Sequence, residues 1–206
     1  MRLLALRLDS HDSNVTYFDG ERIRYRSFER DLQIKHFGFE GLYGWTKILK
    51  EWDIVPQEVD AVGIVMDSHV HNEIEYDPQK QTETVEIPVF RDLGFNCPIH
   101  RIDHHYAHSL SFWPLEVEPN LHFVFDGFGD DWMYRSVWRD GKLIDYGKSN
   151  AQDIFNSASL GFIMSHLGMI IQLQGNYLDY AGKIMAMKAY GQENPDVVPV
   201  DHIDKL

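Results

Sequence analysis

The sequence predicts an α/β protein with mixed sheets, and three features of the chain support this class. Short apolar runs with the length of buried strands alternate with segments whose apolar residues recur at helical spacing. Hydrophobic residues make up 44% of the chain and aromatic residues 13%, which is too rich in core-forming side chains for disorder. A pattern of strand, polar loop and hairpin also occurs twice, at 3–24 and 122–146.

The predicted elements of the first part of the chain alternate between strands and helices. The pair Asp19-Gly20 is typical of a hairpin turn, and apolar residues from Leu42 to Trp52 recur at helical spacing. In chain order we expect strands at 3–8, at 15–18 and from residue 22, a helix at 41–52, a strand at 61–66, a polar surface excursion at 67–86, strands at 87–90 and 99–102, and a helix at 103–112.

The second part of the chain begins with a copy of the opening pattern. Pro114 and Pro119 predict a crossing between two lobes, so we expect a first lobe of residues 1–118 and a second of residues 119–206. Two such openings around a cleft are what an actin-like, ribonuclease-H-like duplication produces, although hairpins are common in other folds. In chain order we expect strands at 122–125, 132–138 and 143–146, a turn at Asp140-Gly141, and helices at 154–171 and 180–190.

Charge and cysteine content argue against several classes of protein. The formal net charge is −13, with 19 basic against 32 acidic residues, which disfavours general nucleic-acid binding. The single cysteine, Cys97, cannot form an intramolecular disulfide, and the first residues lack the apolar stretch of a signal peptide. The longest apolar stretch, 160–173, is shorter than the roughly 20 residues of a membrane helix. We therefore expect a cytoplasmic protein without a membrane span.

The segment from Asp103 to His108, D-H-H-Y-A-H, carries the strongest local signal for chemistry. On a helix, His104 and His108 are four positions apart, so both imidazoles lie on one face and can bind a single metal ion. His105 points elsewhere. A helix with exposed histidines explains the same spacing equally well, because two ligands leave a metal site incomplete.

Two loops that follow predicted strands contain groups suited to a phosphate or a carbonyl. Asp126, Gly127 and Gly129 form one of them, in which glycines let a phosphate approach the backbone and the aspartate can hold a metal or water. The other loop contains His11 and Asp12. Both loops are also compatible with ordinary turns, because glycine, aspartate and serine favour turns.

A third segment near the end of the chain offers a cation and a carboxylate. Lys183 follows a glycine near a predicted helix start and can reach a phosphate as a point charge, while Asp179 can accept from ribose hydroxyls. Equally, Lys183 can be a solvated surface charge beside core residues.

Together and in order, these segments resemble the O-carbamoyltransferases of nodulation-factor and antibiotic biosynthesis. The resemblance covers nearly the whole chain, and five ordered matches are far more specific than any one of them. The matched segments are Leu8–Asn14 with Asp19-Gly20 (the family's H-D-S opening and D-G turn), Phe28–His36 (E-E-R-F-x-R-x-K-H), His104–Ser109 (H-H-x-A-H-A), Val124–Asp130 (V-x-D-G-x-G-E), and Ser159–Gly161 with Ala181–Gly191 (S-L-G-x-x-Y and E-G-K-x-M-G-L-A-x-Y-G).

The resemblance implies an actin-like domain similar to the tRNA-threonylcarbamoylation protein. Such a domain transfers a carbamoyl group from carbamoyl-adenylate, made from ATP and carbamoyl phosphate, to the hydroxyl of a small-molecule acceptor. The implied roles are iron, zinc or a similar divalent metal on His104 and His108, catalysis by His11 and Asp12, and nucleotide contacts by Asp126, Gly127, Gly129, Asp179 and Lys183.

The sequence also departs from the family pattern. Asn14, Asp130 and Ala181 replace the usual residues, and the family's third metal ligand is an aspartate well beyond residue 191. The matched segments also include none from the family's adenylate-forming domain. The resemblance therefore implies an incomplete second lobe, and partners that include a complementing chain or a second copy.

Two other functions remain open. A non-catalytic nucleotide-binding or assembly module, or one half of a split enzyme, would keep the fold and depend on another chain. A metal hydrolase that uses His104 and His108 is the weaker alternative, because the sequence has no H-E-x-x-H or comparable complete motif.

Overall fold

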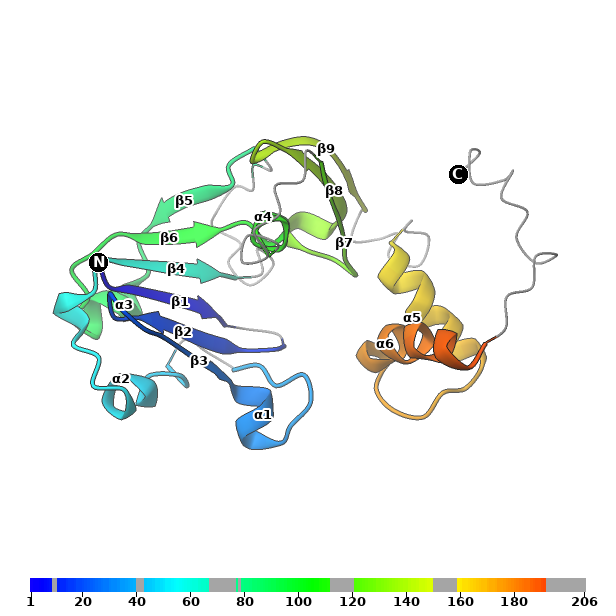
Figure 1. The fold of residues 1–206 in the computed structure, drawn as a ribbon, viewed down its shortest axis with the longest axis horizontal. Helices are drawn as coiled ribbons and strands as arrows, with labels where there is room; N and C mark the ends of the chain where they lie inside the picture. Colours follow the sequence, from blue (N-terminus) through cyan, green and yellow to red (C-terminus); the bar gives the residue numbers. More distant parts are fainter. Residues whose placement is uncertain are drawn as a thin grey trace.

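The first 102 residues contain a six-stranded mixed sheet in the computed structural model, which describes residues 1–8, 11–39, 43–66, 77, 79–111, 121–149 and 159–191. The strands are β1 (Leu3–Arg7), β2 (Asn14–Phe18), β3 (Ile23–Ser27), β4 (Ala61–Val65), β5 (Thr82–Val85) and β6 (Ile99–Ile102). Their order across the sheet is β3-β2-β1-β4-β6-β5, as Figure 1 shows.

The pairing in this sheet combines an antiparallel meander with parallel strands. β1 pairs antiparallel with β2, and β2 pairs antiparallel with β3. β4 pairs in parallel with both β1 and β6, while β5 is antiparallel to β6 at the edge. This arrangement confirms the predicted α/β class with mixed sheets.

Three short helices cover one face of this sheet and bury the main core. They are α1 (Phe28–Leu32), α2 (Lys47–Glu51) and α3 (Pro88–Asp92), with a 3-10 turn, η1, at Pro56–Glu58. Alternate residues of β1, Leu4 and Leu6, are buried together with Phe28, Ile48 and Phe90 of the helices. Because side chains alternate across a strand, only one face of β1 joins this core.

The second sheet is an antiparallel meander of three strands, β7 (His122–Phe125), β8 (Met133–Arg139) and β9 (Lys142–Lys148). Asp140 and Gly141, at φ 50° and 70°, form the predicted turn between β8 and β9. Two positive φ angles are the requirement of a type I′ hairpin turn, which aspartate followed by glycine meets at low cost. The repeat of the opening pattern therefore gives two separate sheets, as predicted.

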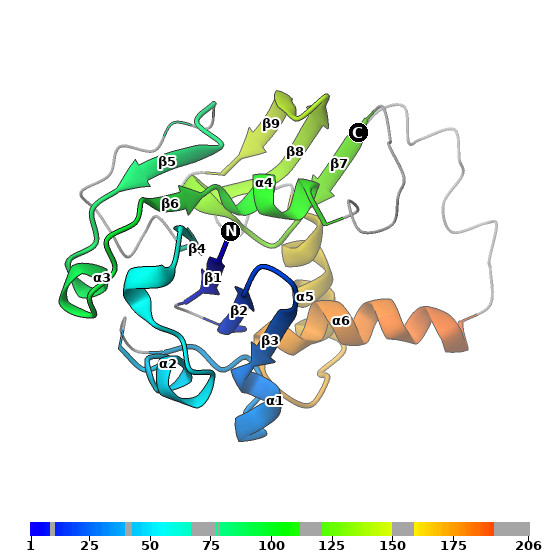
Figure 2. The same ribbon diagram turned by 60° about the vertical axis from the view of Figure 1, so that its left-hand side comes forward.

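Three further helices complete the described structure. They are α4 (His104–Ser109), α5 (Leu160–Ile170) and α6 (Tyr177–Met187), with 3-10 turns η3 at Asp130–Trp132 and η5 at Lys188–Tyr190. α4 follows β6 directly and packs on the second sheet, where Tyr106 lies 5.4 Å from the Trp138 ring. α5 and α6 pack against each other beside the two sheets (Figures 1 and 2).

Several predicted boundaries differ from the structure. The strand expected at 87–90 is wrong, because Pro88 begins helix α3 and the strand β5 lies earlier, inside the expected surface excursion. Proline is favoured in the first turn of a helix, and the consecutive buried residues Val89 and Phe90 imitated a strand. α1 was not predicted, α2 and α4 are shorter than expected, and α6 begins three residues before residue 180.

Part of the sequence prediction falls on residues that the structure does not describe. The proposed lobe boundary near Pro114 and Pro119 lies outside the described residues, as do 154–158 of the helix expected at 154–171. The described part of that helix begins after Ser159, whose hydroxyl caps it by accepting from the Phe162 amide. Among the helices that are described, none has the length and apolar character needed to cross a membrane.

Phe90 gives a direct test of the first core. Its side chain is fully buried and packs on Trp45 and Phe95, at ring distances of 5.9 and 5.5 Å. Phe90→Ala should lower the free energy of unfolding by about 3–5 kcal/mol, because it removes apolar contacts and leaves a cavity. The measurement is urea unfolding followed by circular dichroism.

The matched control is Phe123→Ala on β7, because the Phe123 side chain is 60% exposed. This change should cost about 1 kcal/mol or less. Equal losses for the two variants would contradict the assignment of the core.

Candidate functional site

Two carboxylates fix the first turn of helix α4 beside the second sheet. The Asp103 side chain accepts a hydrogen bond from the Tyr106 amide at 2.7 Å, as an N-cap residue does. Asp130, which is fully buried in the loop after β7, accepts from the His104 amide at 3.0 Å. The start of α4 is therefore fixed both by its own cap and by the loop after β7 of the second sheet.

The His104 and His108 imidazoles converge on the carboxylate of Asp126. His104 Nε2 lies 2.7 Å from Asp126 Oδ2, His108 Nε2 lies 3.2 Å from the same oxygen, and the two nitrogens are 3.0 Å apart. Burial favours a raised pKa for Asp126, but hydrogen bonds from both histidines lower the pKa well below its ordinary value. Asp126 is therefore an anion that faces two imidazole nitrogens.

This donor set fits a divalent transition metal. Tetrahedral coordination with metal–ligand distances of about 2.0–2.2 Å places ligand atoms roughly 3.3 Å apart, close to the separations in this cluster. Two imidazoles and one carboxylate suit iron, zinc or nickel better than magnesium. His104 faces the cluster through Nε2, and its buried Nδ1 has no hydrogen-bond partner among the described residues. Asp126 thus joins the predicted pair as a third candidate ligand.

His105 points away from this cluster, as predicted, and packs against β8 of the second sheet. The Trp138 indole donates to Ser136 Oγ at 2.7 Å, and His105 contacts Ser136 Oγ through Nδ1 at 2.8 Å. Its Nε2 donates to the Met133 carbonyl at 2.9 Å. Burial lowers the pKa of His105 to about 4, so the ring is neutral at physiological pH. His105 is a structural residue.

The glycines of the loop after β7 have different surroundings. A Cβ on Gly129 would lie 2.4 Å from His105 Cδ2, so this glycine allows the loop to pack against α4. A Cβ on Gly127 would meet nothing within 4 Å, and Gly127 lines an open cavity. Nucleotide contact by either glycine stays a prediction, and the surroundings of Gly127 suit a ligand better.

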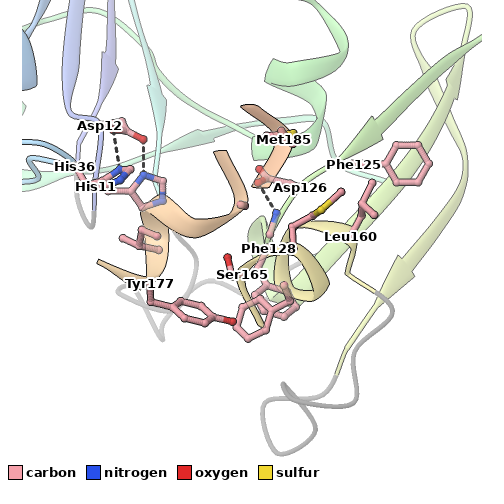
Figure 3. A pocket seen from close by; sticks show the side chains of 16 residues that line it. His11, Asp12, His36, Phe125, Asp126, Phe128, Leu160, Ser165, Tyr177 and Met185 are labelled. Atoms are coloured by element: carbon pink, nitrogen blue, oxygen red, sulfur yellow. Dashed lines mark hydrogen bonds and ion pairs between the residues drawn. The ribbon is translucent and has the colours of Figure 1, made fainter. Parts of the chain in front are cut away.

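A cavity of about 510 Å³ separates Asp126 from a second group of polar residues. His11, Asp12 and His36 lie on one side of it, and Asp126 lies on the other, as Figure 3 shows. Apolar side chains from β7, α5 and α6 form the remaining wall, including those of Phe125, Phe128, Leu160, Phe162, Tyr177 and Met185. The two strand-loop openings thus contribute to one cavity.

His11 and Asp12 form a hydrogen-bonded pair in this cavity. His11 Nδ1 lies 2.7 Å from Asp12 Oδ2, which leaves His11 Nε2 available to another group. Partial burial favours a raised pKa for Asp12, but hydrogen bonds to His11 and Glu29 and the charges of His11 and His36 lower the pKa overall. The pair can orient an imidazole toward a bound molecule.

Asp179 and Lys183 do not line the cavity. The Asp179 carboxylate accepts from Lys35 and, at 2.9 Å, from His36 Nε2, and these contacts lower its pKa well below the ordinary value. Lys183 donates to the Gln174 carbonyl and lies 3.7 Å from Asp179. Their predicted role in nucleotide binding therefore requires a change of partners and stays a prediction.

Sequence reasoning missed three residues that build the site. His36 lies between Asp12 and Asp179, Asp130 anchors α4, and Ser159 donates to the carbonyls of Asp126 and Gly127 at 3.0 and 2.7 Å. The K-H pair in the family resemblance was an available signal for His36. Asp130 and Ser159 also lie in matched segments, Val124–Asp130 and Ser159–Gly161, but their partners are distant in the sequence, so no local pattern predicted their contacts.

Comparison with known proteins gives weak likenesses. No protein-family model matches the sequence, and no curated protein matches it. Solved structures with similarity include one from Pseudomonas aeruginosa described as an uncharacterized protein with similarity to peptidase YeaZ, at 15% identity and TM-score 0.39 over 72% of this chain. Another is YeaZ from Pseudomonas aeruginosa, at 15% identity and TM-score 0.37 over 73%. This chain spans 64% and 66% of those two chains.

The converging ligands predict selective protection by transition metals. Zinc or nickel added to chelator-stripped protein should raise the melting temperature more than magnesium does, because binding to the folded state stabilises it. The double change His104→Ala and His108→Ala, and separately Asp126→Asn, should abolish this difference. The measurement is a thermal melt of each variant with and without each ion.

His100→Ala is the matched control, since His100 lies on β6 and contacts Thr84. It should leave the metal-dependent rise intact. If the double variant keeps the same rise as the wild type, His104 and His108 are not ligands.

Proposed function

We propose that the chain is the catalytic part of a metal-dependent O-carbamoyltransferase. The observation that carries the proposal is the meeting of three motifs, distant in the sequence, around adjoining cavities. His11 and Asp12 come from the first motif, His104 and His108 from another, and Asp126 from a third, and all five line a cavity of about 390 Å³. The ordered resemblance to O-carbamoyltransferases and this common location support the same function.

The proposed reaction moves a carbamoyl group from carbamoyl-adenylate to an acceptor hydroxyl. The bond between the carbamoyl carbon and the phosphate oxygen breaks, a bond to the acceptor oxygen forms, and AMP leaves. The hydroxyl proton needs a base, and His11, held by Asp12 through Nδ1, has Nε2 free for this role. The Asp12 carboxylate would stabilise the imidazolium that results.

His104, His108 and Asp126 would hold the metal in this reaction. A divalent metal supplies Lewis-acid stabilisation of charge on a phosphate or carbonyl oxygen. The protein's part is to keep the three ligands together, through the hold of Asp103 and Asp130 on the start of α4. This rigidity limits the reorganisation needed when substrate binds.

The apolar wall of the larger cavity supports binding of an aromatic or apolar body. Phe128 and Phe162 lie 4.7 Å apart, and Tyr177 lies 5.5 Å from Phe162. An adenine base or the body of an acceptor can pack on such rings, while polar groups at the other side hold its reactive end. Binding of nucleotide, carbamoyl phosphate and a hydroxyl acceptor is part of this proposal.

A second candidate is a non-catalytic assembly module or one half of a split enzyme. The observation that favours it is the exposure of large apolar side chains on α5 and α6, such as Ile170 at 73% and Met185 at 61%. Exposed apolar patches often mark protein interfaces. A complementing chain or a second copy would cover them.

The proposed reaction predicts AMP release from carbamoyl-adenylate. Zinc- or iron-loaded wild type should accelerate release in the presence of a simple alcohol, measured by chromatography against the uncatalysed rate. His11→Asn and Asp126→Asn should each lower the acceleration by about 100-fold or more, since they remove the base and a metal ligand.

His100→Ala, on a strand outside the cavities, should retain the wild-type rate. A wild type with no acceleration would overturn the proposed activity and leave the assembly module as the better account. If the wild type and all three variants accelerate the release equally, the activity does not come from this site.

A further inference from the structure

A second cluster of metal-ligand groups lies across the larger cavity from Asp126. It consists of Asp12 in the segment between β1 and β2, Glu29 in α1 and His36 after α1. One ligand atom from each residue lies within 4.8 Å of the others, and His36 Nδ1 is 3.6 Å from Asp12 Oδ1. Glu29 and His36 lie seven residues apart in one segment, and the fold brings the separate segment that contains Asp12 beside them.

The charges of this cluster need a positive partner. The carboxylates of Asp12 and Glu29 are close enough to interact directly, and two carboxylates in contact repel each other unless a proton or a cation lies between them. Lys35, the cation nearest in sequence to His36, is directed to Asp179 instead. The ion pairs that Asp12 makes within the described residues are with His11 and His36.

The His36 ring is held as a metal-bound histidine usually is. Its Nε2 lies 2.9 Å from Asp179 Oδ1, and Asp179 is an anion that also accepts from Lys35, so Nε2 carries a hydrogen. Metal-bound histidines commonly donate their second ring nitrogen to a carboxylate, which fixes the tautomer and the ring orientation. The other nitrogen, Nδ1, lies 3.6 Å from Asp12 Oδ1.

In each of the two carboxylates, Asp12 and Glu29, one oxygen contacts a group outside the three clustered side chains. Asp12 Oδ2 contacts His11 Nδ1 at 2.7 Å, so Oδ1 is the atom that faces His36. Glu29 Oε2 accepts from the His36 amide at 2.9 Å, which holds its carboxylate beside the ring. Each side chain is thus oriented by an outer contact and presents one donor atom to the centre.

We infer that Asp12, Glu29 and His36 bind a second divalent cation, separate from the one proposed at His104, His108 and Asp126. Two carboxylates and one imidazole form a harder donor set than two imidazoles and one carboxylate, so manganese suits this second centre. The alternative is a doubly protonated His36 between Asp12 and Asp179. The inference concerns binding alone and does not depend on the proposed transfer reaction.

Manganese binding can be measured by the loss of the electron paramagnetic resonance signal of the free ion. The full chain with His104→Ala and His108→Ala lacks the first centre and should still bind one equivalent. Glu29→Gln added to this background should weaken binding by at least about tenfold, because it removes a ligand charge. Glutamine keeps an oxygen that can accept from the His36 amide, so this change spares the structural contact.

Pulsed electron paramagnetic resonance on the bound manganese distinguishes metal binding by His36 from the alternative of a doubly protonated His36. Manganese bound by His36 should show coupling to an imidazole ¹⁴N nucleus, and His36→Gln should remove it. Asp53→Asn, an exposed acid with a positive φ that asparagine tolerates, is the control and should change neither the affinity nor the coupling. Circular dichroism verifies folding of each variant.

Asp126→Asn provides a second background if the double histidine variant does not fold. Loss of all manganese binding in a folded background, or bound manganese without ¹⁴N coupling, would overturn the inference. Equal affinity with and without Glu29→Gln would overturn it as well, because the cluster would then not supply the ligands.

Discussion

The packing of the loop after β7 against helix α4 is the contact on which the proposed site depends. Asp130 is fully buried there and accepts from the His104 amide, and Gly129 lacks the Cβ that would collide with His105. Loss of this hydrogen bond would leave a buried carboxylate without that partner, at a cost on the order of 1–3 kcal/mol or more, so the contact stabilises the packing of the loop on α4. The same loop carries Asp126, so one contact sets the third ligand against the first two.

The net charge of the molecule and the charged groups that line the cavity bear on what the site can bind. With a net charge of −13 the protein repels anions at long range, so a phosphate has to be held by local positive charge. The cavity is lined instead by carboxylates and imidazoles, Asp12 and His36 on one side and Asp126 on the other. Divalent cations bound at the two proposed centres would reverse this local charge.

The sequence predicted those parts of the fold whose signals are local. The D-G turn at Asp140-Gly141 was found because a type I′ turn needs two residues that tolerate positive φ. The repeated strand pattern and the i, i+4 spacing of His104 and His108 were likewise local. The strand expected at 87–90 failed because helix α3 is only five residues long, too short to show a helical period.

The rest of the site depends on tertiary contacts. Asp126 was predicted as a nucleotide contact and as a residue that can hold a metal or water. The packing of its loop on α4 brings its carboxylate to 2.7 Å from His104 Nε2. The cluster of Asp12, Glu29 and His36 joins two segments, one with Asp12 and one with Glu29 and His36, whose pairing no local pattern records. X-ray absorption spectroscopy of chelator-stripped protein with one equivalent of zinc tests the central claim most directly. The account predicts two imidazoles and at least one carboxylate oxygen at about 2.0–2.2 Å, with the carboxylate oxygen lost in Asp126→Asn. A zinc shell without imidazole scattering would contradict it.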